Sequence, residues 1–358
     1  MSTVDEAQKT VEATSSSDGA NGAGEGVIAT AGTPDKQSRW TRKRLLIAAG
    51  LVGALFVLIG AVFVWYLITH KPISSLPGLT DNATPHYRYS VYGVNQPLGV
   101  AVNSDGSRIY VTQSGGTQKA LVFDGDGKQI QVLTPPATTG ANHLPVYVAL
   151  DPNTGEAYVS DRLAGAIYVY SATGKYERAF THVGVTGVWA PLGMTFDSKG
   201  QLYVTQAFAS TKSIYVFSTS GNLVRTITTS TAMSFPNGVA VDAKGNIVVT
   251  DGNNGRALFL NAAGKEVSQV HAGLAKGDLG LPRGVAFDSE GHVLIVDATD
   301  QGVRVYGFAG ETVNYVGTFG DQGVGDGLFQ YPNGIAADTR AHVYVTDRVN
   351  NRVQVWSY

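Results

Sequence analysis

The chain has 358 residues, with 26 Lys and Arg against 28 Asp and Glu, and it contains no cysteine. The lack of cysteine excludes a disulfide framework, a cysteine-ligated zinc site and a cysteine nucleophile. The formal net charge of −2 provides no global attraction to nucleic acid, so we expect no nucleic-acid partner.

Residues 1–39 consist mostly of Ser, Thr, Ala, Gly and acidic residues, with almost no large apolar side chains. Such a segment cannot bury enough surface to offset the entropy of ordering it. We therefore predict a disordered tail over 1–39, with no residue that carries chemistry.

Residues 40–69 are predicted to form a transmembrane helix. The segment from Leu45 to Ile68 contains no charged residue, Asn or Gln, and as a helix it would extend about 36 Å, enough to span a hydrocarbon core of about 30 Å. Four basic residues precede it and only His70 and Lys71 follow it closely. The positive-inside rule therefore predicts a cytoplasmic tail and an extracytoplasmic C-terminal region.

A cleaved signal peptide is the alternative for this segment, but its apolar region would be about 7–15 residues long and end at an A-x-A-like site. The run here is longer and HKPISSLPG is no such site, so we favour a signal anchor. Small residues four apart, such as Ala49 and Gly53, have the spacing of a helix–helix contact. This spacing predicts a weak homodimer through the helix.

Residues 70–85, rich in proline, are predicted to form an exposed linker. The remaining region, 86–358, repeats one pattern six times. Each repeat has an alternating apolar segment such as GVAVD, a D-x-x-G turn, a second segment such as IVVTD, and two further strand-like segments. The spacing of about 45–50 residues is that of a four-stranded propeller blade. The repeats start at Pro97, Pro145, Pro191, Pro236, Pro282 and Pro332.

Two features predict how these strands are arranged. The fourth residue after each proline is small, which fits the innermost strand, where the blades converge; these residues are Ala101, Ala149, Thr195, Ala240, Ala286 and Ala336. The last repeat supplies only three strands, and one unpaired strand, Tyr87 to Gly93, precedes the first repeat. Pairing this strand with the last blade would close the ring and remove its exposed edges. We therefore predict an all-β domain that is a closed six-bladed β-propeller.

The repeats resemble those of the NHL-repeat family, whose units read Pro–x–Gly–hydrophobic–Ala–x–Asp, then Gly, a strand ending in Asp, and N-x-R. The segments TDGNNGRALFL at 250–260 and TDRVNNRVQVW at 346–356 match this pattern best, whereas Gln113 and Gln206 replace the Asp in two earlier repeats. The resemblance covers about 86–358 and implies an NHL-like propeller of a membrane-anchored bacterial type. It does not fix a function.

Ligand binding is expected on the face that carries the second-to-third-strand loops and the connections between blades, which we call the variable face. The opposite face, which carries the short hairpin turns, is called the turn face. The strand at Tyr87 starts at the turn face, so the variable face is predicted to be membrane-distal. The residues after the repeat prolines are expected at the channel mouth, half of them apolar and half polar, where they would suit an amphipathic or anionic ligand; these residues are Leu98, Val146, Leu192, Asn237, Arg283 and Asn333.

The variable face also carries Asp161, Asp251, Asp297 and Asp347. A ring of acids is one way to bind a cation, but the resemblance implies that each Asp caps its loop or pairs with Arg256, Arg304 or Arg352 of its own blade. Arg162 and Arg348, each directly after one of these acids, are predicted to face the ligand.

Catalytic propellers offer the alternative function, a membrane-tethered metal-dependent hydrolase or lyase of the lactonase or peptide-amidating-lyase type. The amidating lyases place zinc-binding histidines directly after the repeat proline, where this chain has none, and His143, His182 and His271 lie at unequal offsets from the next proline. Asn237 and Asn333 resemble the Asn of the lactonase N-G motif, but no matching Glu follows the N-terminal strand. His292 and His342 are expected to be surface residues without carboxylate partners. We therefore expect no catalytic residue, metal or cofactor.

The prediction is a single-pass cell-membrane protein whose extracytoplasmic propeller is a binding module, that is, a sensor or scaffold. Its expected ligand is a protein or a cell-surface polymer. The arrangement resembles the extracellular sensor part of bacterial receptor kinases without the kinase. A spacer role in the cell envelope is the third option.

Overall fold

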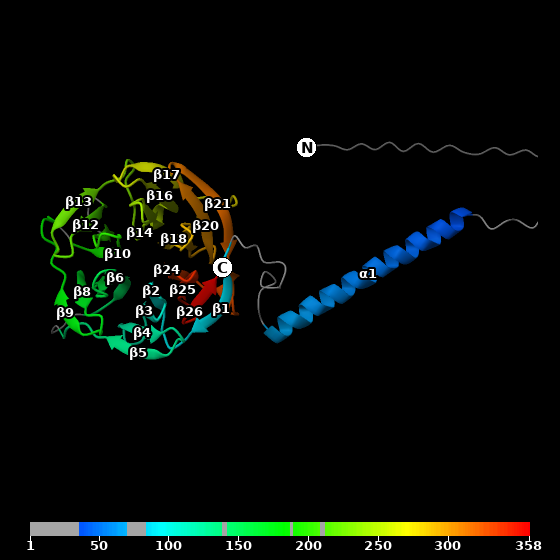
Figure 1. The fold of residues 1–358 in the computed structure, drawn as a ribbon, viewed down its shortest axis with the longest axis horizontal. Coiled ribbons are helices and arrows are strands. Elements are labelled where there is room, and N and C mark those ends of the chain that lie inside the picture. The colour runs from blue at the N-terminus through cyan, green and yellow to red at the C-terminus, as the bar shows by residue number, and fades with distance from the viewer. Residues whose placement is uncertain (1–35, 70–83, 138–141, 187–188, 208–211) are drawn as a thin grey trace, which may run out of the picture. The chain divides into compact units, whose positions relative to one another are not determined.

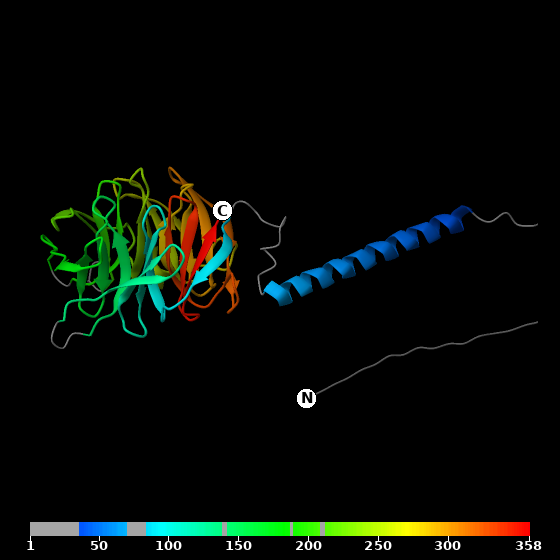
Figure 2. The same cartoon turned by 60° about the horizontal axis from the view of Figure 1, so that its bottom comes forward.

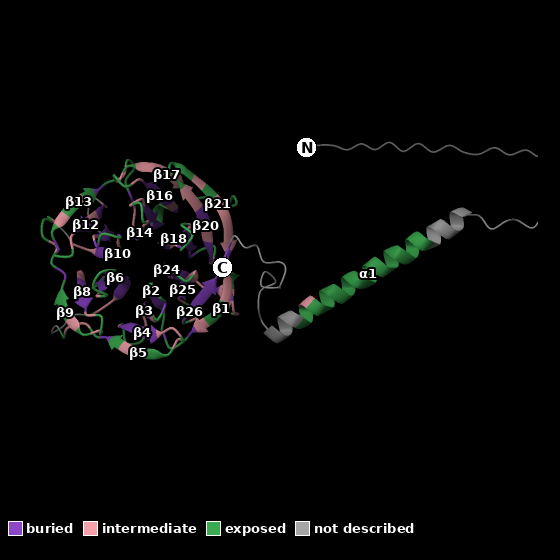
Figure 3. Ribbon diagram, in the orientation of Figure 1, coloured by how far each residue is buried: buried purple, intermediate pink, exposed green. Residues whose placement is uncertain are grey.

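The structure, a computed structural model, describes residues 36–69, 84–137, 142–186, 189–207 and 212–358. The predicted tail lies outside these residues except for its last four, and the predicted linker lies outside them except for Thr84 and Pro85. Helix α1 spans Lys36–Thr69, so it begins four residues before the predicted start and ends where predicted. Its segment Lys43–Val64 is long and apolar enough to cross a membrane, and nearly all the side chains of that segment are exposed (Figure 3).

The C-terminal region is a ring of six four-stranded antiparallel sheets, as predicted (Figures 1 and 2). We number these blades in chain order. Blade 1 contains β2 (Pro97–Val102), β3 (Arg108–Gln113), β4 (Ala120–Asp124) and β5 (Gln129–Leu133). Blade 2 contains β6 (Pro145–Leu150), β7 (Ala157–Asp161), β8 (Ala166–Tyr170) and β9 (Tyr176–Ala179). Blade 3 contains β10 (Pro191–Phe196), β11 (Leu202–Gln206), β12 (Ile214–Phe217) and β13 (Leu223–Ile227).

The second half of the ring repeats this arrangement. Blade 4 contains β14 (Pro236–Val241), β15 (Ile247–Asp251), the short 3₁₀ helix η2 (Gly252–Asn254), β16 (Arg256–Leu260) and β17 (Glu266–Val270). Blade 5 contains β18 (Pro282–Phe287), β19 (Val293–Asp297), β20 (Gly302–Ala309) and β21 (Thr312–Phe319). The connection from blade 5 to blade 6 holds β22 (Asp321–Gln322) and β23 (Leu328–Phe329), which pair in parallel. Blade 6 contains β24 (Pro332–Ala337), β25 (His342–Asp347), β26 (Arg352–Ser357) and β1 (His86–Val91).

Ring closure depends on β1, which supplies the outer strand of blade 6. It pairs antiparallel with β26 from His86↔Ser357 to Val91↔Val353, and Figure 1 shows this first strand beside the last one. The Tyr87 ring packs edge-on against Trp356 at 5.9 Å between centroids. The predicted pairing of the two ends of the propeller sequence is therefore confirmed, and the outer edge of β26 is covered.

The repeat-opening strands are the innermost ones, as the small residues predict. Their side chains line a central cavity of about 380 Å³, and all six predicted small residues contribute to its wall. Large aromatic side chains lie further out, on the third strands. Tyr168, Tyr170 and Phe259 are buried there. Figure 3 shows the same gradient, with buried inner strands and more exposed outer strands.

Neighbouring blades are joined by a hydroxyl side chain on the second strand, which we call the hydroxyl bridge. In blade 6, the Thr346 hydroxyl accepts a hydrogen bond from the Gly334 N–H at 2.6 Å and donates one to the Leu98 carbonyl of blade 1 at 2.8 Å. Four other blades repeat this arrangement. Their hydroxyls belong to Thr112, Ser160, Thr205 and Thr250.

The hydroxyl bridge requires two backbones to approach closely. A Cβ atom added to Gly334 would lie 2.4 Å from the Leu98 carbonyl oxygen, and one added to Gly193 would lie 1.9 Å from the Asn237 carbonyl oxygen. Glycine is therefore needed for blade packing at these two positions, whereas blade 2 has Tyr147 at the corresponding place. Blade 5 alone lacks the hydroxyl, because Val296 stands at the corresponding position before Asp297.

We predict that Thr346→Val lowers the free energy of unfolding by roughly 1–3 kcal/mol, because a buried N–H and a buried carbonyl each lose a partner without a change in side-chain volume. The converse substitution, Val296→Thr, introduces the missing hydroxyl and is expected to add about 1 kcal/mol. Urea unfolding of the full chain in detergent measures both. Unchanged unfolding of Thr346→Val would contradict a structural role for the bridge.

Candidate functional site

The strand register defines the two faces of the ring. Each repeat proline lies opposite the last residue of the second strand, for example Pro236 opposite Asp251 and Pro332 opposite Asp347. This end of the blades, with the second-to-third-strand loops, is the variable face. The hairpin turns lie at the other end, where β1 also begins, since His86 pairs with Ser357 and Ser357 with His342.

The last residue of each second strand holds the connection between blades. In all six blades its side-chain oxygen accepts a hydrogen bond from a backbone N–H one or two residues before the repeat proline. The acceptors are Gln113, Asp161, Gln206, Asp251, Asp297 and Asp347. The carboxylates are at most 1% exposed. The prediction that these acids cap their loops is confirmed, and the two glutamines keep the same bond.

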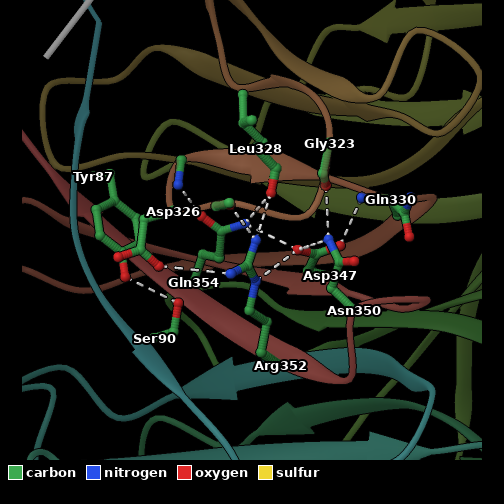
Figure 4. Close-up of polar contacts among 12 residues, drawn as sticks. Tyr87, Ser90, Gly323, Asp326, Leu328, Gln330, Asp347, Asn350, Arg352 and Gln354 are labelled. Atoms are coloured by element: carbon green, nitrogen blue, oxygen red, sulfur yellow. Dashed lines mark hydrogen bonds and ion pairs between the residues drawn. The ribbon is translucent and has the colours of Figure 1, made fainter. Parts of the chain in front are cut away.

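Blade 6 has the most extensive of these networks (Figure 4). The second carboxylate oxygen of Asp347 accepts from Arg352 Nε at 2.9 Å, Asn350 Nδ2 at 2.8 Å and Gln354 Nε2 at 3.0 Å. Arg352 is 4% exposed, and it also donates to the carbonyls of Gly325 and Leu328. The guanidinium therefore fixes the β22–β23 connection against the last strand.

The predicted pairing of the loop acids with arginines holds in two blades and is wrong in one. Arg256 Nε binds Asp251 at 2.9 Å, as Arg352 binds Asp347. Arg304 instead binds Asp300 and the Asp278 carbonyl. In that blade both Asp297 oxygens are occupied by the N–H groups of Gly280 and Leu281 and by Thr299, so Asp297 is satisfied without a cation.

The apolar half of the predicted channel mouth is a packed cluster. Leu98, Val146 and Leu192 of blades 1–3 are each at most 8% exposed, and they pack with Tyr147 and Ala207, with Leu144 and Phe235 at the margin. The structure therefore brings these three predicted residues together, and only their outer surfaces are open to a ligand.

The polar half belongs to blades 4–6. Asn237 is 3% exposed and Asn333 is 7% exposed, while Arg283 is partly buried. Arg283 Nη2 reaches the Tyr331 hydroxyl at 3.5 Å. The amide nitrogen of Asn237 and the Nε of Arg283 are buried and have no hydrogen-bond partner among the described residues. Arg283 also forms no ion pair within the described part of the chain.

Sequence reasoning missed Tyr147. It occupies the place where the other five repeats have Gly, and this departure from Pro–x–Gly was the available signal. Its ring lines a cavity of about 40 Å³ together with Gly238, Gly284 and Gly334 of blades 4–6, so it lies near the channel axis. Its hydroxyl is buried without a partner among the described residues. Burial raises the pKa of Tyr147 well above its usual range, and the Arg283 charge opposes that rise.

Two further predicted residues, Arg162 and Arg348, each lie near an aromatic ring. The Arg162 guanidinium lies 6.0 Å from the Phe235 ring centroid and that of Arg348 lies 6.0 Å from the Tyr331 ring centroid. Phe235 and Tyr331 directly precede repeat prolines and have φ angles of 70° and 55°, a strained conformation for aromatic residues. These four side chains form an aromatic and cationic rim. That they contact a ligand stays a prediction.

The histidines are dispersed. His143 Nδ1 lies 2.7 Å from Asp161, and His182 stacks on Trp189 at 4.3 Å. The expectation that His292 and His342 lack carboxylates is wrong, since each pairs with the Asp four residues earlier, at 3.1 and 2.9 Å. Among the described residues no group of three or more His, Asp or Glu is placed to hold a metal ion.

A family model described as NHL repeat matches residues 233–256 and 329–356, which lie in blades 4 and 6. The chain contains NHL repeats and folds as a six-bladed β-propeller. No match was found among curated proteins.

Several solved structures share the fold of this NHL propeller. A streptogramin B lyase has a TM-score of 0.56 and 13% identity, covering 78% of this chain and 99% of that chain. A virginiamycin B lyase from Staphylococcus aureus has a TM-score of 0.54 and 14% identity, covering 77% and 99%. A chain from a nidogen/laminin complex has a TM-score of 0.50 and 19% identity, covering 62% and 79%. At these identities the likeness shows the fold alone.

The loop acids allow a matched comparison within the NHL propeller. We predict that Asp347→Asn lowers the free energy of unfolding by about 3 kcal/mol or more, because the buried Arg352 loses its closest counter-charge. Asp297→Asn is expected to cost only about 1–2 kcal/mol, because it removes a hydrogen bond and leaves no cation unpaired. Urea unfolding midpoints compare the two. Equal losses would contradict the charge-pairing role of Asp347.

Proposed function

We propose that this protein is a membrane-anchored, non-enzymatic binding module that presents the variable face of its propeller to a protein or a cell-surface polymer. The observation that supports this most is the amphipathic channel mouth, with an apolar arc of Leu98, Val146 and Leu192 beside a polar arc that contains Asn237 and Arg283. The carboxylates of the loop acids form hydrogen bonds that hold the connections between blades. The side chains at the channel mouth, in contrast, differ in type from blade to blade.

The proposed location is the cell membrane, with the tail in the cytoplasm and the propeller outside. The apolar span Lys43–Val64 and the basic residues before it support this arrangement. We also propose a weak homodimer through the small residues of α1, Ala49 and Gly53 among them. No nucleic-acid partner is proposed, since the formal charge is −2.

The second candidate is a tethered metal-dependent hydrolase or lyase. Two of the similar solved structures are lyases, of streptogramin B and virginiamycin B, and this likeness is at the level of the fold only. Because His143 and His182 are engaged with Asp161 and Trp189 rather than with each other, we give the binding module precedence.

The lack of natural cysteine permits a clean test of orientation. We predict that Ala263→Cys, in the exposed β16–β17 turn, reacts with a membrane-impermeant maleimide on intact cells. Ser15→Cys in the tail is expected to react only after permeabilisation. Labelling by mass spectrometry or gel shift measures both. The opposite pattern would contradict the proposed orientation.

Photo-crosslinking tests the proposed binding face. A benzophenone side chain at Val349, which is 55% exposed beside Arg348 on the variable face, is expected to capture one defined macromolecule on intact cells. The same group at Ala263 on the turn face is the control and is expected to capture none. Equal capture from both positions, or none from Val349, would contradict the proposal.

A further inference from the structure

The channel mouth contains three hydrogen-bond donors that the propeller itself does not use. These are the Tyr147 hydroxyl, the Asn237 amide nitrogen and the Arg283 Nε, from blades 2, 4 and 5. Each is buried without a hydrogen-bond partner among the described residues. Leaving a buried polar group unpaired costs about 1–3 kcal/mol, so three at one mouth call for a functional explanation.

Tyr147, Asn237 and Arg283 lie at the variable-face ends of the inner strands β6, β14 and β18. Tyr147 shares the wall of one small cavity with Gly238 and Gly284, the residues that follow Asn237 and Arg283. The Arg283 charge acts on the Tyr147 phenol. Asn237 and Tyr147 are more than nine-tenths buried, so packing restricts the movement of both side chains.

The side chain of Arg283 supplies a positive charge at this mouth. Arg283 forms no ion pair with any described carboxylate, and its guanidinium donates to the neutral Tyr331 hydroxyl at 3.5 Å. The nearby acids of the variable face are occupied, because Asp251 binds Arg256 and Asp297 binds backbone N–H groups. An arginine with adjacent neutral donors is a suitable receptor for a carboxylate.

The apolar arc sits beside this group of donors. Leu98, Val146 and Leu192 pack around Tyr147, so a ligand whose anionic end reaches Arg283 would have its body over these side chains. Pockets of this kind, apolar with a few convergent polar groups, favour amphipathic ligands.

We propose that the channel mouth binds the carboxylate of an amphipathic ligand, with Arg283, Asn237 and Tyr147 donating to the carboxylate and Leu98, Val146 and Leu192 contacting the apolar body. This deepens the proposed function, on which it rests, by naming the ligand class. The carboxylate of a peptide C-terminus and that of an acidic surface polymer present the same chemistry.

The test uses the full chain in phosphatidylcholine nanodiscs and the probe 4-phenylbutyrate, with binding followed by saturation-transfer NMR against empty nanodiscs. Uncharged 4-phenylbutanamide tests the need for charge, and acetate tests the need for the apolar body. We expect both to bind at least about tenfold more weakly than 4-phenylbutyrate. Equal binding of the acid and the amide would overturn the carboxylate assignment.

Variants locate the site. Arg283→Gln is expected to weaken 4-phenylbutyrate about tenfold or more, and Tyr147→Phe several-fold. Lys244→Gln, which removes an exposed charge from the turn face, is the matched control and should bind as the wild type does. Thermal unfolding of each variant checks folding. If Arg283→Gln unfolds, Arg283→Lys replaces it, with an expected intermediate loss because the charge remains while the Nε donor is removed.

A second pair of probes separates the two sources of the carboxylate. A short apolar peptide with a free C-terminus is compared with its C-terminal amide, and a soluble polyuronate is compared with its methyl ester. Weaker binding of either uncharged form supports the proposal and names the source. If none of these probes binds while Val349 still crosslinks a macromolecule, the carboxylate proposal fails and the binding module stands. If Val349 also captures nothing, the proposed function fails with it.

Discussion

The structure depends on the close approach of each inner strand to the next blade. In five blades a hydroxyl from the second strand accepts a hydrogen bond from a backbone N–H of its own blade and donates one to a carbonyl of the neighbouring blade, as Thr346 does with Gly334 and Leu98. The N–H belongs to a glycine in four of these blades and to Tyr147 in blade 2. In blade 6 the glycine is needed because a Cβ on Gly334 would collide with the Leu98 carbonyl. Repeated in five of the six blades, this contact satisfies backbone groups at the convergent centre, where water access is limited.

This arrangement separates what must be constant from what can vary. The blade-joining bonds use the carbonyl of the residue after each proline, not its side chain, so Leu98, Asn237 and Arg283 can differ without loss of the ring contacts. The same holds for the loop acids, where glutamine keeps the acceptor role of aspartate in blades 1 and 3. Chemical variety is therefore concentrated at the channel mouth, where a ligand can reach it.

Much of this was predictable because propeller geometry is local and periodic. The prolines, the small inner residues and the unpaired strand near Tyr87 identified six blades and the closure with β26. Side-chain partners were harder to predict, because they depend on competition between groups that are distant in sequence. Arg304 bonds to Asp300 rather than Asp297, since backbone N–H groups already occupy Asp297. Tyr147 was missed because a departure from a repeat pattern does not reveal where the new side chain points.

The sequence by itself determined the apolar span, the number of blades, the radial order of the strands within each blade and the residues that follow the repeat prolines, because these follow from hydrophobic periodicity and repeat spacing. Only the tertiary structure decided which polar groups are used in folding and which remain unpaired. The loop acids and Arg352 form buried hydrogen bonds, while Tyr147, Asn237 and Arg283 each keep a buried donor without a partner among the described residues. That difference arises from packing between blades about 45 residues apart along the chain, which no local pattern encodes.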